Sequence, residues 1–177
     1  MDGLFTTLSM SHISNDLPPV NCEVRFIADS MLGTLAKKLR MLGLDTEYYS
    51  DVDMSELMYR CKAESRILLT KNRKLVDGLG ISVWMVTGDG YWEEFLSIAR
   101  LLSESGAGYK FLCRCTQCNG GLIEISGENV KEEVPPHVLR TCSRFMKCSG
   151  CDRVYWKGTH ENRMNREAAR MMERLVK

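Results

Sequence analysis

Residues 23–50 read EVRFIADSMLGTLAKKLRMLGLDTEYYS, and this stretch predicts a strand, a helix and a second strand. The two strands are expected over residues 23–29 and 45–50. Between them, apolar residues recur at the three- and four-residue spacing of one helix face, namely Leu32, Leu35, Ala36, Leu39 and Leu42. Gly43 follows them in the position where helices commonly end. A strand–helix–strand unit is the building block of an α/β fold.

The same alternation continues along the chain. Residues 53–65 predict a helix, residues 66–70 a strand, residues 72–80 a short helix and turn, residues 81–87 a fourth strand and residues 90–106 a helix. The third of these strands, RILLT, has consecutive apolar residues, as a buried parallel strand does. We therefore predict an α/β domain over residues 22–108, with a parallel sheet flanked by helices. The polar residues 1–21 predict a flexible tail.

Polar residues follow the predicted strands at their carboxyl ends, where open α/β sheets collect their chemistry. These residues are Asp29, Asp51, Asn72 and Asp89. Each acid taken alone is also explained as a helix N-cap, and Asp29 and Asp53 suit that role well. The set of four predicts a cluster at one edge of the sheet.

Two Cys-x-x-Cys pairs dominate the second part of the chain. Cys115 with Cys118 and Cys148 with Cys151 form two pairs with 29 residues between them, and each pair can hold one side of a tetrahedral ion. This spacing predicts a zinc ribbon, with redox-active or merely buried thiols as the alternative. Zinc bound by four thiolates has no open position, so the ion would be structural. Cys113 is expected to be a spare thiol.

The segment between the two pairs is too long for a hairpin turn and predicts a short helix near Pro136. After the ribbon, a helix carries a basic stripe that includes Arg163, Arg166 and Arg170. This stripe fits RNA binding, and a solvated helix face is the alternative. Residues 109–177 are accordingly predicted to form a zinc ribbon with a basic C-terminal helix.

Charge separates these two parts. Residues 1–108 hold 11 Lys and Arg against 15 Asp and Glu, whereas residues 109–177 hold 13 against 8. An acidic part beside a basic part suits a carboxylate metal centre next to a surface for a polyanion, although ordinary scatter of surface charge also explains it.

The chain has no apolar run of membrane-spanning length, so no membrane partner is expected. Its first twenty residues contain no Lys or Arg and lack the apolar centre of a signal peptide. We therefore expect a cytoplasmic protein. In that reducing compartment, eight cysteines favour metal ligands or buried thiols over disulfides.

Several of these stretches resemble one family. They are similar to the PIN-like RNase domain at the C-terminus of Mut-7-type exonucleases. The stretches that carry the resemblance are RFIADSMLGTLAKKLRMLGLDTEYYSD, RILLTKNRKL, the Cys pairs with VPPHV between them, and CDRVYWKGTH. The family also occurs as short microbial proteins with a zinc ribbon. The resemblance implies a PIN-like fold in which acids at strand ends hold Mg²⁺ or Mn²⁺ to cleave RNA.

Carried over to this chain, the resemblance assigns metal-binding acids to Asp29, Asp51 and Asp89, with Asp53 as a near alternative to Asp51. One position departs from the family, because Asn72 stands where the pattern LLT-[RK]-D has a carboxylate. An amide oxygen can bind Mg²⁺ but brings no charge, so the metal affinity should fall. Asp77 is a poor substitute, since five residues along a helix turn it away from the Asn72 face.

Two functions follow from these residues. The first is a metal-dependent ribonuclease, whose catalytic residues would be Asp29, Asp51, Asn72 and Asp89. In this function the phosphate backbone of the RNA would be bound by Lys71, Arg73 and Lys74. The second is a non-catalytic RNA-binding or ribosome-associated protein that binds through the ribbon and through Arg163, Arg166 and Arg170. A folded domain without a nucleic-acid role is the remaining alternative. The sequence does not predict the RNA substrate or the oligomeric state.

Overall fold

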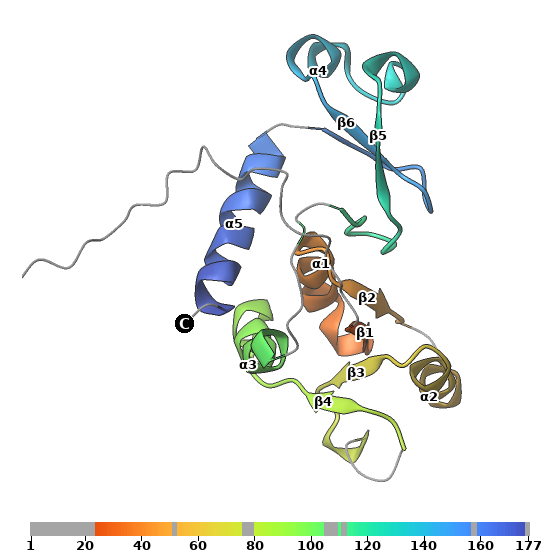
Figure 1. Cartoon of the computed structure of the whole chain (residues 1–177), viewed down its shortest axis with the longest axis vertical. Coiled ribbons are helices and arrows are strands. Elements are labelled where there is room, and N and C mark those ends of the chain that lie inside the picture. Colours follow the sequence, from red (N-terminus) through yellow and green to blue (C-terminus); the bar gives the residue numbers. More distant parts are fainter. Residues whose placement is uncertain are drawn as a thin grey trace, which may run out of the picture.

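A computed structural model describes residues 24–50, 53–75, 80–104, 110, 113–156 and 159–175. It contains a four-stranded parallel sheet with its helices, a smaller antiparallel sheet, and a long last helix (Figure 1). The predicted tail over residues 1–21 lies outside the described residues. Within the described ranges, no helix has both the length and the apolar character needed to cross a membrane.

The parallel sheet has the order β2-β1-β3-β4. Its strands are β1 (Arg25–Ala28), β2 (Asp45–Tyr48), β3 (Ile67–Thr70) and β4 (Val83–Met85). All neighbouring strands run parallel, with Phe26 paired to both Thr46 and Ile67. The predicted parallel α/β sheet is thus confirmed, with each strand shorter than its predicted range.

Helices cover both faces of this sheet (Figure 1). On one face, Phe26 and Ala28 pack in one buried cluster with side chains of α1 (Gly33–Met41) and α3 (Tyr91–Glu104). On the other face, Ile27 packs with Leu57 of α2 (Met54–Ala63). Successive strand residues point to opposite faces, so the apolar residues of β1 contribute side chains to the buried clusters on both faces of the sheet.

The turn from α1 into β2 explains Gly43. Its φ of +88° lies in the left-handed region, and Leu44 N–H bonds back to the Leu39 carbonyl as in a Schellman cap. A Cβ at residue 43 would lie 2.3 Å from the Lys110 carbonyl oxygen. Gly43 therefore permits both the cap and the close passage of the chain that leads to the ribbon.

Short 3-10 helices follow two of the parallel strands. The first, η1 (Ser30–Leu32), runs directly into α1, so the predicted helix over residues 30–43 has two segments. The second, η2 (Arg73–Leu75), begins the region predicted as a short helix and turn.

The antiparallel sheet forms the ribbon. Its strands β5 (Leu122–Ile125), β6 (Phe145–Cys148) and β7 (Val154–Trp156) lie in chain order. Between β5 and β6 the chain forms η3 (Gly127–Val130) and then α4 (Pro136–Thr141), which confirms the predicted helix at Pro136. These two helices and β6 share a small buried cluster that includes Val130, Val138 and Phe145.

The last helix, α5 (Thr159–Leu175), lies beside α3 (Figure 1). Ala168 and Met171 are almost fully buried and belong to the same cluster as Phe95 and Ile98 of α3. In addition, Lys38 of α1 forms a 2.6 Å ion pair with Glu167. This helix thus packs on the first part of the chain, although its sequence places it after the ribbon. The domain boundaries drawn from the sequence stay a prediction.

A buried arginine joins the ribbon to the parallel sheet. Arg40 of α1 is 4% exposed, and its Nε donates to the Thr46 carbonyl of β2 at 2.7 Å. Its Nη1 donates to the carbonyls of Thr116 and Gln117, within the first Cys-x-x-Cys turn, at 3.2 and 2.8 Å. Asn119 completes the junction, because its Oδ1 accepts from Thr46 N–H at 3.1 Å. The turn thereby covers β2, an edge strand whose backbone would otherwise lack a partner on that side.

We predict that Arg40→Met lowers the free energy of unfolding by about 3 kcal/mol, because three buried carbonyls lose a charged donor. Urea unfolding measures the change. Lys37→Met is the matched control, since Lys37 is exposed on the same helix and should change the stability by less than about 0.5 kcal/mol. Equal stability of the two variants would show that this junction is not a source of stability.

Candidate functional site

The candidate site lies where the order of the parallel strands changes direction. The chain passes from β1 outward to β2 and then returns across β1 to β3. Open α/β sheets bind their ligands outside the carboxyl ends of the strands at such a point. The residues that follow β1 and β3 here are Asp29 and Lys71, and the last residue of β3 is Thr70.

Asp29 connects these two strand ends. It is 7% exposed, and its Oδ2 accepts a hydrogen bond from the Thr70 hydroxyl and a 3.3 Å hydrogen bond from Lys71 N–H. Its Oδ1 accepts from Met31 N–H at 2.9 Å, which caps η1. The N-cap role considered from the sequence is therefore real, and it coexists with the contacts across the switch point. Both carboxylate oxygens are held in place before any ligand arrives.

A lysine occupies the space between the strand-end acids. Lys71 Nζ lies 2.8 Å from Glu94 Oε1 and donates to the Gly88 carbonyl at 2.6 Å. The hydrogen bond with Glu94 raises the pKa of Lys71 despite partial desolvation, and the charges of Glu94, Asp89 and Asp29 act in the same direction. One ammonium thus balances carboxylates that come from three separate elements.

Glu94 is a member of this group that sequence reasoning missed. It is 7% exposed and lies in the first turn of α3, five residues after Asp89. Acids in that turn are common because they stabilise the helix dipole, so Glu94 carried no distinct signal. Its burial and its pairing with Lys71 arise only when α3 packs beside the end of β3.

The other predicted catalytic residues are placed differently. Asn72 is exposed, and its Oδ1 accepts from Lys74 N–H at 3.1 Å, so the amide caps η2. Asp89 is also exposed after β4, where its N–H donates to Glu93 Oε2. Asp51 and the rejected substitute Asp77 lie outside the described residues. Asp53, the alternative to Asp51, is the exposed N-cap residue of α2.

This edge suits a cation in its charge and its donor atoms. Asp29, Asp89 and Glu94 offer the oxygen ligands that Mg²⁺ and Mn²⁺ take, and the Lys71 ammonium shows where a positive charge is stabilised. The acids are spaced around that ammonium rather than drawn onto one point. Within the part of the chain that the structure describes, the only group of three or more His, Cys, Asp or Glu with converging ligand atoms is the cysteine group. A divalent ion here would take the place of Lys71.

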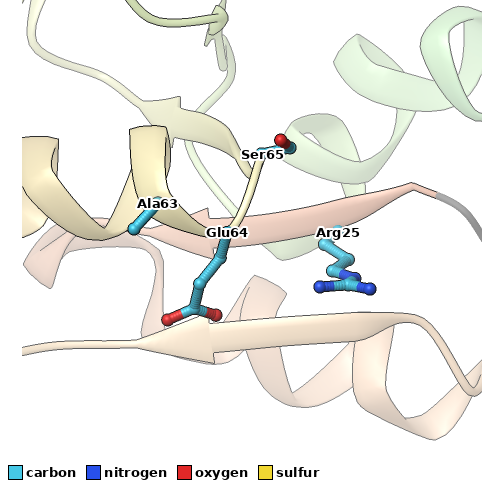
Figure 2. Close-up of a pocket in the computed structure, with 4 residues that line it drawn as sticks. All are labelled: Arg25, Ala63, Glu64 and Ser65. Atoms are coloured by element: carbon cyan, nitrogen blue, oxygen red, sulfur yellow. The ribbon is translucent and has the colours of Figure 1, made fainter.

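The opposite edge of the sheet has a different character. A hollow of about 290 Å³ lies near the amino end of β1 and the turn that leads into β3 (Figure 2), and it is lined by Arg25, Ala63, Glu64 and Ser65. Next to it, the buried Arg66 pairs with Asp45 and Glu64, each at 2.6 Å. These charges neutralise one another, and no predicted site residue lines this hollow.

The four ribbon cysteines form a compact group. Their Sγ atoms all lie within 4.8 Å of one another, with 3.3 Å between Cys118 and Cys148 and 3.6 Å between Cys115 and Cys151. A tetrahedral zinc ion with 2.3 Å bonds separates its sulfurs by about 3.8 Å. The group is thus of the right size and donor type for one structural zinc ion. Cys113 is not part of it, and its Sγ lies 4.0 Å from the Gly43 carbonyl oxygen.

Neighbouring groups favour the ionised form of one of these cysteines, Cys115. Burial opposes ionisation of Cys115, but hydrogen bonds from the Tyr155 hydroxyl and from backbone N–H groups lower its pKa to about 6. A Cβ at Gly120 would lie 3.0 Å from Cys148 Sγ, so glycine lets the first turn approach the second pair without displacing that sulfur. The ribbon thus favours the thiolate at Cys115, the form that binds zinc.

The predicted RNA-binding residues lie on two surfaces. Arg73 and Lys74 are exposed directly after β3, beside the candidate site, whereas the Lys71 ammonium is held by Glu94. Arg163, Arg166 and Arg170 are exposed on α5, outside the face of Ala168 and Met171 that packs on the core. Their roles in RNA binding stay predictions.

The architecture is thus that of a parallel α/β domain with acids at a topological switch point, joined to a ribbon with a four-cysteine site. Residues 24–168 match the Mut7-C RNAse domain, and the chain belongs to this family. The family resemblance predicted from the sequence is therefore confirmed. A search of curated proteins and a search of solved structures each found no match.

We predict that the purified protein contains one zinc ion per chain. Cys118→Ser and Cys148→Ser should both lose the zinc and unfold the ribbon, because a structural zinc ion supplies folding free energy directly. Cys113→Ser is the matched control and should keep one zinc. Metal analysis by mass spectrometry, with thermal unfolding of each variant, makes the comparison. A folded wild-type sample with almost no zinc would contradict the assignment.

Proposed function

We propose that this protein is a metal-dependent ribonuclease with a PIN-like fold, and that it cleaves RNA at the carboxyl edge of its parallel sheet. The observation that carries the proposal is Asp29, a nearly buried carboxylate fixed between β1 and β3 at the switch point. Membership of an RNase domain family supports RNA as the substrate.

Asp29, Asp89 and Glu94 are the described residues that would hold a divalent ion, with Asp51 as a further ligand. When bound, the ion would activate a water molecule and neutralise charge on the phosphate. Asn72 would contribute an uncharged oxygen, although that oxygen is presently used to cap η2. The ligand set therefore has one carboxylate fewer than the pattern of the family implies.

The cations around this edge suit the substrate. Arg73 and Lys74 are exposed next to Asn72 and would bind phosphates on either side of the scissile bond. Lys71 pairs with Glu94 and donates to the Gly88 carbonyl in the unliganded protein. Once displaced from Glu94 by a divalent ion, its ammonium would lie within reach of the same phosphate.

The alternative is a protein that binds RNA, alone or on the ribosome, without cleaving it. Two observations favour this alternative: Lys71 already neutralises the acids, and the Asn72 oxygen already has a donor. The two functions differ in what the acids do, so variants of Asp29 and Asn72 separate them.

We predict that wild-type protein cleaves single-stranded RNA in millimolar Mn²⁺ or Mg²⁺ and that Asp29→Asn abolishes the cleavage. The amide can accept fewer of the three hydrogen bonds now made to the carboxylate. The variant should therefore also lose about 1 kcal/mol of stability, but it should remain folded at 25 °C. Gel assays of cleavage and urea unfolding provide the two measurements.

Glu128→Gln is the control for this experiment, because Glu128 is exposed on the ribbon and its loss removes the same charge. It should cleave RNA at the wild-type rate. Wild-type protein with a full zinc content that leaves RNA intact for hours in millimolar Mn²⁺ would instead support the binding function.

We also predict that Asn72→Asp raises the cleavage rate at limiting Mg²⁺, because it adds a charged oxygen ligand at the end of β3. Aspartate caps a helix as well as asparagine does, so the stability should change by less than about 0.5 kcal/mol. Cleavage rates over a Mg²⁺ titration test the effect. Asn129→Asp, at an exposed position on the ribbon, adds the same charge far from the site and should have no effect. An unchanged or lower Mg²⁺ response in Asn72→Asp would remove residue 72 from the metal site.

A further inference from the structure

A second hollow lies between the start of α3 and α5. Its volume is about 380 Å³, within the range of small-ligand pockets. Four side chains line it, namely Tyr91, Trp92, Glu167 and Arg170. None of them was singled out from the sequence except Arg170, and the proposed cleavage site uses none of them.

Two aromatic rings with fixed orientations form part of the wall. The Tyr91 and Trp92 rings meet edge to face, with 6.4 Å between centroids and an interplanar angle of 77°. Trp92 is stacked on the fully buried Phe95 at 6.0 Å, and Lys38 Nζ lies 4.8 Å from the Tyr91 centroid. Each ring is therefore anchored by a partner beneath it. Rings that are both partly exposed and rigid offer contact area at little cost in conformational entropy.

The charges around the rings suit a polyanion that carries flat groups. Arg170 lines the hollow, and Arg163 and Arg166 are exposed on the same helix. Glu167 is the one acid in the wall, and its charge is balanced by Lys38 at 2.6 Å. Aromatic platforms beside a row of cations are the combination that binds single-stranded nucleic acid, in which bases stack while phosphates meet the cations.

The hollow is also connected to the proposed cleavage edge. Tyr91 and Trp92 are followed directly by Glu93, whose carboxylate caps the Asp89 N–H, and by Glu94, which holds Lys71. The first turn of α3 thus carries both the aromatic rings and the acids, with Tyr91 and Glu94 three residues apart on neighbouring positions of the helix surface. A strand of RNA that reaches the acids would pass this turn.

We propose that the hollow is a nucleobase site, in which one base of a single-stranded RNA stacks on one of the two perpendicular rings, Tyr91 or Trp92, and packs against the edge of the other, while Arg170 binds an adjacent phosphate. This site rests on the proposed function only in taking RNA as its ligand. The base is recognised by its flat face rather than by its edge, so binding tolerates any of the four bases.

The test compares a 12-nucleotide RNA with the same RNA in which several adjacent bases are replaced by abasic sites. Fluorescence anisotropy measures both affinities without added Mg²⁺ or Mn²⁺, so that no cleavage occurs. For wild-type protein the abasic RNA should bind at least about five-fold more weakly, as expected for one lost base–aromatic stack. For Tyr91→Leu and Trp92→Leu, this penalty should largely disappear, because both RNAs then lack the stack.

Two further variants make the result specific. Trp92→Phe keeps a flat ring and should keep most of the penalty, whereas a leucine of similar bulk should not. Trp156→Leu removes another exposed tryptophan, on β7 of the ribbon, and should keep the wild-type penalty. Circular dichroism and thermal unfolding establish that each variant is folded. Arg170→Gln should weaken the binding of both RNAs by the same factor. It should also reduce the slope of log affinity against log salt concentration by about one unit.

The outcomes separate this proposal from the nuclease. A penalty that is absent in wild-type protein, or unchanged in both leucine variants, overturns the nucleobase site even if the protein cleaves RNA. A penalty that disappears in the leucine variants supports the site even if no metal restores cleavage, and the nuclease proposal alone then fails. Wild-type protein that binds neither RNA overturns the nucleobase site as well.

Discussion

The burial of one guanidinium group, that of Arg40, is the interaction on which the arrangement of the two parts depends. A buried cation is costly unless its donors and its charge are satisfied. Here its donors are taken by carbonyls of β2 and of the first cysteine turn. Burial lowers the pKa of Arg40, and the nearby thiolates of Cys115 and Cys118 oppose that shift. A zinc ion with four thiolates carries a net charge of −2, so a ribbon loaded with zinc would supply the anion that this cation needs.

This arrangement joins metal binding to the parallel sheet. The same cysteine turn covers the free edge of β2 through Asn119 and sets the position of Asp45, which in turn pairs with Arg66 at the amino ends of the strands. A zinc ion bound by these cysteines would therefore support more than the ribbon itself. The acids at the carboxyl edge depend on strands whose outer member is held by the cysteine turn.

Local patterns predicted much of this structure. The β1–α1–β2 unit follows from the spacing of apolar residues and from Gly43, and the cysteine group follows from its own spacing, because each of these signals lies within a short segment. What escaped prediction involves partners distant in sequence. In the sequence, Glu94 looks like any acid in the first turn of a helix, and its pairing with Lys71 requires the packing of α3 against the sheet. The apolar face of α5 that contains Ala168 and Met171 was not predicted, because the arginines of that helix indicated a solvent-exposed helix. The Asp29 carboxylate serves both as an N-cap and as a bridge between strands, and only the second role requires the tertiary fold.

The packing of α5 has a consequence for how this protein is made. Chains fold in stages as they leave the ribosome, with amino-terminal domains usually first. Here the cluster around Phe95 and Ile98 remains open until Ala168 and Met171 have been translated. The parallel sheet and its acids thus emerge long before the helix that completes their core. An RNase domain is synthesised beside messenger and ribosomal RNA, and the core of this one closes only after the ribbon and α5 have followed the parallel sheet out of the ribosome.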